Sequence, residues 1–295
     1  MKDFALKPTD ADQAMCRLYA FTATEPTKVE CTLVHAQNAL MSQSRRDLSG
    51  GHHTNGWGIV TYETGKPHLE KQSWAAYHGE HFKRAAAKIY SRTVLAHIRK
   101  ATVGNSVLAN THPFTSGKWA FAHNGTVPGF SKLQRKLCEL ISEERRAGIG
   151  GETDSEHVFA YLLTLLDQHG ESDIETLLAR CARTITEFAT EASPRAKLGL
   201  NIMLTDGEQV YGTCLGRSLY YVERKGLYDC EICGFPHIHH DPDVNYWGAV
   251  VASEPITHEA WIKVADGSVW RASKSDQTLQ IQTLDAFTSQ SSIGS

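Results

Sequence analysis

The 295-residue sequence has no long hydrophobic run and no marked excess of charge of either sign. No apolar stretch approaches the roughly 20 residues that a membrane-spanning helix needs. Residues 1–15 lack the apolar segment of a secretory signal. The net charge of −3 gives no general electrostatic reason to expect nucleic acid or an anionic membrane as a partner. We therefore expect a protein that binds neither.

The sequence also lacks the paired cysteines of a disulfide scaffold. Its seven cysteines are an odd number, and most of them lie in apolar or helical patterns. This usage favours a reduced, cytoplasmic protein. Repeats and a clear linker are absent as well, and a hydrophobic content of 41% is enough for a substantial core.

Hydrophobic periodicity predicts an α+β domain in which helices and strands are segregated. Apolar residues spaced four, three and four apart predict a helix over 26–41. Further helices are predicted over 81–90, 131–148, 158–169 and 174–192. Strands are predicted over 17–21, 59–62, 93–98, 118–122, 198–204, 209–215, 219–223 and 247–252.

Cys16 directly follows Met15 and precedes a predicted strand. If the mature chain starts at Cys16, one residue carries a thiol and a free α-amine, whose pKa of about 8 makes it a mild base. A nucleophile and a base on one residue form a known catalytic arrangement. The alternative is an inert, half-buried strand cysteine. We interpret residues 1–15 as a leader or a mis-assigned start.

Two further sites follow predicted strands. Arg99 lies where a buried strand meets a loop, and a guanidinium there can hold a carboxylate by two parallel hydrogen bonds. A solvated arginine is the alternative. Asn124-Gly125 is typical of a hairpin turn. The same pair could instead supply two donors to an oxyanion hole, each typically contributing about 3 kcal/mol.

Asp154 lies inside a capping box formed by Thr153 and Glu156, which is a complete structural explanation for it. The functional alternative is that Asp154 faces a pocket and binds an ammonium group. His112 is either a pocket residue or a packed loop histidine. His53 lies in a polar loop, so we expect it to be exposed to solvent.

The pair Cys230-x-x-Cys233, followed by His237 and His239, is a candidate metal site within a segment, residues 229–245, that looks like an insertion. Thiolates at this spacing are good zinc ligands, and imidazole can complete a tetrahedron. Only one such cysteine pair is present, and the histidine spacing is not that of a standard finger. An insertion loop without metal is the alternative.

The order of these motifs along the chain is more specific than any one of them. The chain reads Met-Cys-Arg at 15–17, Asn-Gly-Trp-Gly at 55–58, His-Ile-Arg-Lys-Ala-Thr at 97–102, Asn-Thr-His-Pro-Phe at 110–114, His-Asn-Gly-Thr at 123–126 and Glu-Thr-Asp-Ser-Glu at 152–156. This order resembles the class II (N-terminal nucleophile) glutamine amidotransferases, most closely the short, stand-alone members such as the γ-glutamyl hydrolase of ergothioneine synthesis. We assign residues 16–270 to this domain and residues 271–295 to a polar tail.

The resemblance implies a four-layer αββα sandwich and a role for each matching position. Cys16 would be the nucleophile, with its α-amine as the base, and Asn124 with Gly125 would form the oxyanion hole. The residues implied for the glutamyl end of the substrate are Arg99 and Thr102 for the α-carboxylate, Asp154 for the α-ammonium and His112 for the pocket.

The implied activity is hydrolysis of the γ-amide of glutamine or of a γ-glutamyl compound through a Cys16 thioester. It requires no cofactor for catalysis, and the Cys230 and Cys233 segment is the candidate site for a structural zinc. Synthase-linked members have a tryptophan and a histidine where this chain has Lys100 and Val103, so a separate synthase subunit or free hydrolysis is expected instead.

The alternative is a non-catalytic or regulatory module with a metal-stabilised interaction loop. The pair Arg99 and Asp154, which suits an amino-acid end, disfavours an acylase or amidase of the wider class.

Overall fold

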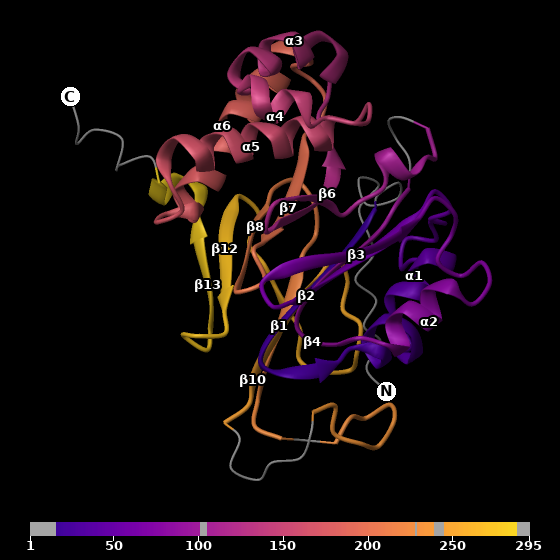
Figure 1. Cartoon of the computed structure of the whole chain (residues 1–295). Helices are drawn as coiled ribbons and strands as arrows, with labels where there is room; N and C mark the ends of the chain where they lie inside the picture. The colour runs from indigo at the N-terminus through magenta and orange to yellow at the C-terminus, as the bar shows by residue number, and fades with distance from the viewer. Residues whose placement is uncertain (1–15, 101–104, 228, 239–244, 288–295) are drawn as a thin grey trace.

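Figure 1 shows the computed structural model of the chain, which describes residues 16–100, 105–227, 229–238 and 245–287. These residues form two antiparallel sheets with helices outside each. The seven-stranded sheet has the order β11-β9-β10-β1-β4-β2-β3. Its strands are β1 (Arg17–Lys28), β2 (Trp57–Glu63), β3 (Lys66–Gln72), β4 (Tyr90–Ile98), β9 (Tyr220–Lys225), β10 (Trp247–Ala252) and β11 (Ile262–Lys263).

The six-stranded sheet has the order β13-β12-β8-β7-β6-β5. Its strands are β5 (Phe114–Ser116), β6 (Trp119–Thr126), β7 (Gly199–Thr205), β8 (Gln209–Cys214), β12 (Ser268–Ser273) and β13 (Thr278–Thr283). The helices are α1 (Leu40–Arg45), α2 (His81–Ala87), α3 (Phe130–Leu140), α4 (Glu143–Ala147), α5 (Asp154–His169) and α6 (Ile174–Ala192). Shorter turns of other types are the π-helical η2 (Cys31–His35) and the 3₁₀ turns η3 (Leu108–Asn110) and η4 (Leu284–Phe287).

The side chains of β1 show how the layers are built. Leu18 and Ala20 join the core between the two sheets, whereas Tyr19 and Phe21 join the core beneath η2, α1 and α2. This alternation is the period of two of a strand that is buried on both faces. A third core lies under α3, α5 and α6. Three cores between four layers confirm the predicted α+β, αββα sandwich.

The predicted helix over 26–41 is wrong as one continuous element. Strand β1 runs to Lys28, and the two short helical turns η2 and α1 follow it. Ala36 and Ala39 interrupt them because both adopt extended ψ angles, 153° and 156°. The apolar spacing correctly marked residues that face the core, since Leu33 and Leu40 are fully buried. Periodicity reports which side is buried and does not require an unbroken helix.

The predicted helix over 131–148 is also divided, because Ile141 is extended and Ser142 caps a separate α4 by accepting from the Arg145 N–H. The helix predicted over 174–192 is confirmed as α6. The sheets extend beyond the predicted strands: β3, β5 and β11 are additional, and the hairpin of β12 and β13 takes residues 271–283 of the expected polar tail into the second sheet.

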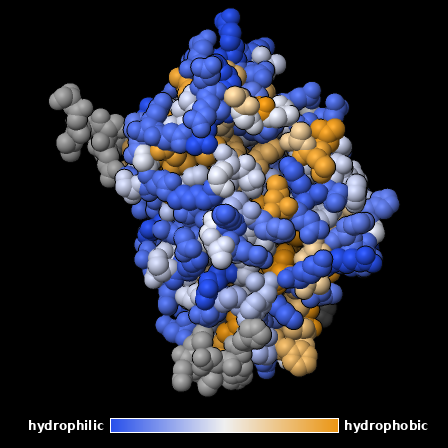
Figure 2. Space-filling model, in the orientation of Figure 1, coloured by the Kyte–Doolittle hydropathy of each residue, from blue (hydrophilic) through white to orange (hydrophobic). Residues whose placement is uncertain are grey.

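Among the helices of the described residues, none has the length and hydropathy to cross a membrane. On the face seen in Figure 2, hydrophobic residues lie in several separate groups among hydrophilic ones.

Candidate active site

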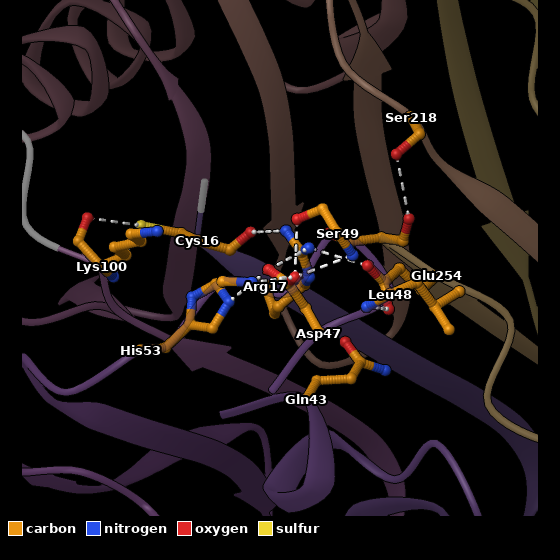
Figure 3. Close-up of polar contacts among 12 residues, drawn as sticks. Cys16, Arg17, Gln43, Asp47, Leu48, Ser49, His53, Lys100, Ser218 and Glu254 are labelled. Carbon is orange, nitrogen blue, oxygen red and sulfur yellow. Dashed lines mark hydrogen bonds and ion pairs between the residues drawn. The ribbon is translucent and has the colours of Figure 1, made fainter. Parts of the chain in front are cut away.

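Cys16 lies immediately before β1, beside the end of β4. The pairing of Arg17 with Ile98 brings these two chain segments together. The Cys16 Sγ accepts from the Lys100 N–H at 3.3 Å and donates to the Lys100 carbonyl at 3.4 Å (Figure 3). Burial raises the pKa of the thiol, while the Lys100 N–H and the guanidinium groups of Arg99 and Arg17 oppose that rise. A thiol in this environment needs a base if it is to attack as a thiolate.

Arg99 follows β4 directly and is buried. Its Nη1 donates to the carbonyl oxygen of Asn105 at 3.0 Å, and the Asn110 amide donates to the same oxygen at 3.1 Å. The Oδ1 of Asn110 accepts from the Glu152 N–H at 3.0 Å. This chain of hydrogen bonds ties the loop beside Arg99 to the segment that starts α5. The solvated alternative for Arg99 is therefore wrong.

Asp154 is the first residue of α5, and both of its carboxylate oxygens are held by the backbone. Oδ2 accepts from the Val127 N–H, which follows β6, and Oδ1 accepts from the Ser155 N–H, both at 2.8 Å. Thr153 caps the helix as predicted, but the Glu156 carboxylate accepts from the Gly150 N–H instead of closing a reciprocal box. Asp154 is buried, and its charge acts on Cys16.

Asn124 and Gly125 lie inside β6 and pair with Asn201 and Leu200 of β7, so the hairpin-turn interpretation is wrong. The Asn124 Nδ2 donates at 3.3 Å to the hydroxyl of Ser253, a residue that the sequence did not single out. Among the described residues, the buried Asn124 Oδ1 has no hydrogen-bond partner.

The Ser253 hydroxyl links Asn124 to the first sheet. Its oxygen accepts from the Leu18 N–H at 3.0 Å, two residues after Cys16. Gly125 lies against the neighbouring strand β7, where a Cβ would collide with the Gly199 carbonyl. The predicted oxyanion-hole pair is thereby connected across both sheets to the start of β1.

His112 is buried, and its ring lies 4.4 Å from the ring of His97 and 4.4 Å from that of Phe114. Burial lowers the pKa of His112 well below its ordinary value, so the ring is neutral at pH 7. These contacts are those of a packed histidine. Thr102 and Val103 lie outside the described residues, as does His239.

A buried ion-pair network behind Cys16 was missed by the sequence interpretation. The Arg17 Nη2 contacts Asp47 at 2.6 Å and Glu254 at 2.7 Å, and its Nη1 donates to the Cys16 carbonyl at 3.1 Å (Figure 3). The His53 Nε2 lies 2.8 Å from Asp47. His53 is fully buried, so its expected solvent exposure is wrong. Asp47 needs buried donors to remain ionised, and His53 is one of them.

A second cluster lies away from this site. Cys230, Cys233 and His237 gather with Cys31, which the sequence interpretation did not include, and their donor atoms all lie within 4.8 Å of one another. A Cys₃His group of this kind is compatible with a structural metal.

The comparisons with known proteins agree with this geometry. A sequence profile of the class II glutamine amidotransferases matches residues 15–293, so the chain belongs to that family. It is 29% identical to a probable glutamine amidotransferase of Saccharomyces cerevisiae, DUG3, over 86% of this chain and 81% of that protein.

Other similarities extend over most of the chain. It is 24% identical to the gamma-glutamyl-hercynylcysteine sulfoxide hydrolase of Mycobacterium tuberculosis, over 90% of this chain and 96% of that protein. The fold matches that of a glutamine aminotransferase class-II domain protein from Silicibacter pomeroyi with a TM-score of 0.60, at 20% identity, over 91% of this chain and 99% of that one.

Proposed function

We propose that the protein hydrolyses the γ-amide of glutamine or of a γ-glutamyl compound, with Cys16 as the nucleophile. The observation that carries the proposal is the convergence of Cys16, Arg99 and Asp154, which come from three separate segments and lie close enough for both charges to act on the thiol. A guanidinium and a carboxylate near one nucleophile suit the carboxylate and ammonium of an amino acid.

The reaction follows from a mature chain that begins at Cys16. The α-amine takes the thiol proton, and Sγ attacks the γ-carbonyl carbon. The Asn124 amide and the Gly125 N–H stabilise the resulting oxyanion. When the C–N bond breaks, the α-ammonium returns the proton to the leaving amine. Water then attacks the γ-glutamyl thioester, which releases glutamate and restores the Cys16 thiol.

Recognition of the glutamyl end does not determine which amine is the leaving group. Ammonia and larger amines both fit this chemistry, because Arg99 and Asp154 would contact only the amino-acid end. The relative named gamma-glutamyl-hercynylcysteine sulfoxide hydrolase supports a larger leaving group. Ammonia would instead be released freely or passed to a separate synthase subunit.

The proposal is tested by following glutamate release from glutamine and from a panel of γ-glutamyl amides. The N-terminal residue of the preparation is first established by intact mass. We expect turnover by protein that starts at Cys16 and none by Cys16→Ala. Cys138→Ala, which alters a partly buried cysteine on α3, is the matched control and should retain activity. Turnover by Cys16→Ala would contradict the proposed nucleophile.

The non-catalytic alternative gives a different result in the same experiment. A regulatory module would keep the residues before Cys16 attached and would release no glutamate from any member of the panel.

A further inference from the structure

We propose that Cys31, Cys230, Cys233 and His237 bind one zinc ion, which fastens the connection between β9 and β10 to η2, just after the end of β1. The proposal is independent of the hydrolase activity. Its basis is the convergence of four soft donors from two segments that are far apart in the sequence, all within 4.8 Å of one another.

The distances suit a single tetrahedral ion. Zinc bonds of about 2.3 Å to sulfur and 2.0 Å to nitrogen place two ligand atoms roughly 3.5–3.8 Å apart. The Cys233 Sγ and the His237 Nε2 are 3.4 Å apart, close to that separation. The four cysteine and histidine donors therefore need only a small contraction to share one ion.

The backbone around Cys230 is arranged to support a thiolate. The Ile232 N–H donates to the Cys230 Sγ at 3.4 Å. The Gly234 N–H donates to the Cys230 carbonyl at 2.8 Å, and Gly234 adopts a φ of 74°, which favours glycine. A turn that directs an N–H at a cysteine sulfur stabilises the charged form and orients it as a ligand.

Three of the four proposed ligands line a cavity. Cys31, Cys230 and His237 line one cavity of about 150 Å³, and no disulfide joins the described cysteines. Three thiols gathered this closely make poor hydrogen-bond partners for one another, because a thiol is a weak donor and a weak acceptor. A cation bound to their thiolates would replace these weak contacts with metal–sulfur bonds.

The donor set identifies the metal and its role. Three thiolates and an imidazole favour zinc over magnesium or calcium, which prefer oxygen. Four protein ligands leave no open position, as in structural sites. The cluster also lies at the far end of β1 from Cys16: the Lys28 N–H donates to the His237 carbonyl at 2.9 Å. A strand of 12 residues separates the two places by a distance on the order of 30 Å.

The connection between β9 and β10 has few other means of staying folded. Its described residues contain no helix or strand, and of them Ile232, Ile238 and Tyr246, which directly precedes β10, pack against the core under η2. Long connections without secondary structure are held by few contacts of their own. A zinc ion would supply binding free energy that is available only to the folded arrangement.

The test is the metal content of purified protein without a histidine tag, followed by cobalt substitution under reducing conditions. We expect about one zinc per chain, and a cobalt form with the intense sulfur-to-cobalt absorption and visible bands of a tetrahedral thiolate site. Cys31→Ser and His237→Ala should lose the metal. Cys138→Ser and His258→Ala, which alters an exposed histidine outside the cluster, are the matched controls and should keep it.

Two results would overturn the proposal. One is wild-type protein that contains no zinc and gives no thiolate–cobalt absorption on reconstitution. The other is stoichiometric zinc in Cys31→Ser, which would show that Cys31 of η2 is not a ligand. The wild-type measurements do not depend on any variant. They can therefore contradict the proposal even if a variant fails to fold.

Discussion

The guanidinium of Arg17 is buried against the carboxylate of Asp47, with Nη2 and Oδ2 2.6 Å apart. Arg17 immediately follows Cys16 and also donates to its carbonyl. The network therefore fixes the peptide that carries the proposed nucleophile. Buried charges remain in a folded protein only if they are paired and hydrogen bonded, and here Glu254 and His53 complete the pairing.

Asp47→Asn should lower the free energy of unfolding by about 3 kcal/mol, because it leaves part of a buried ion pair uncompensated. Urea unfolding followed by circular dichroism measures the change. Glu191→Gln is the matched control, since it removes an exposed carboxylate from a surface pair with Lys136 and should change stability by less than about 1 kcal/mol. Equal effects of the two substitutions would show that the buried network is not a significant source of stability.

The same network predicts a loss of stability in acid. Burial opposes ionisation of Asp47, but the hydrogen bonds from His53 and the charge of Arg17 outweigh it and hold the Asp47 pKa well below its ordinary value. The stabilisation is therefore complete above the unfolded pKa of about 4 and is lost as the pH falls below it. Unfolding curves between pH 6 and pH 2 should be less steeply pH-dependent in Asp47→Asn. An unchanged dependence would assign the acid sensitivity to other groups.

Asn124→Ala should lower kcat by about 100-fold or more with a smaller change in KM, since the amide would act on charge that develops in the transition state. Steady-state glutamate release separates the two parameters. Asn245→Ala, at an exposed position before β10, serves as the matched control and should not change kcat. A rise in KM alone would place Asn124 in ground-state binding.

The two ends of the glutamyl group can be assigned with substrate analogues. Glutaramic acid lacks the α-amine, and 4-aminobutanamide lacks the α-carboxylate. Asp154→Asn should lower kcat/KM for glutamine while barely affecting glutaramic acid. Arg99→Met should show the same selectivity with 4-aminobutanamide. Each substitution should therefore weaken recognition of only one end of the glutamyl group. Equal losses of kcat/KM on all substrates would indicate a structural role for both residues.

The sequence predicted the family and the αββα sandwich because both depend on local patterns and on the order of short motifs. Cys16, Arg99 and Asp154 could be selected together because each stands in such a motif. Their proposed catalytic roles remain predictions. The sequence did not predict that Asn124 and Gly125 lie within β6, because this pair is typical of a turn. Pairing with β7 keeps both residues extended.

The partners of Arg17 could not be predicted. Asp47 and Glu254 lie 30 and 237 residues away in the sequence and form no spacing pattern with it. His53 stands in a stretch rich in polar residues, yet it is buried and lies in hydrogen-bond contact with Asp47. Cys31 lies within the predicted helix over 26–41, and only the fold brings it to Cys230 and Cys233. Long-range contacts of this kind carry no local signal.

The most direct test of the account is covalent labelling with a diazoketone analogue of glutamine, read by intact mass and peptide mapping. The account predicts one label per chain, on the sulfur of Cys16, in a peptide whose first residue is Cys16, with activity lost in proportion to labelling. A label on another residue, or full activity in protein that still carries Met15 attached to Cys16, would contradict it.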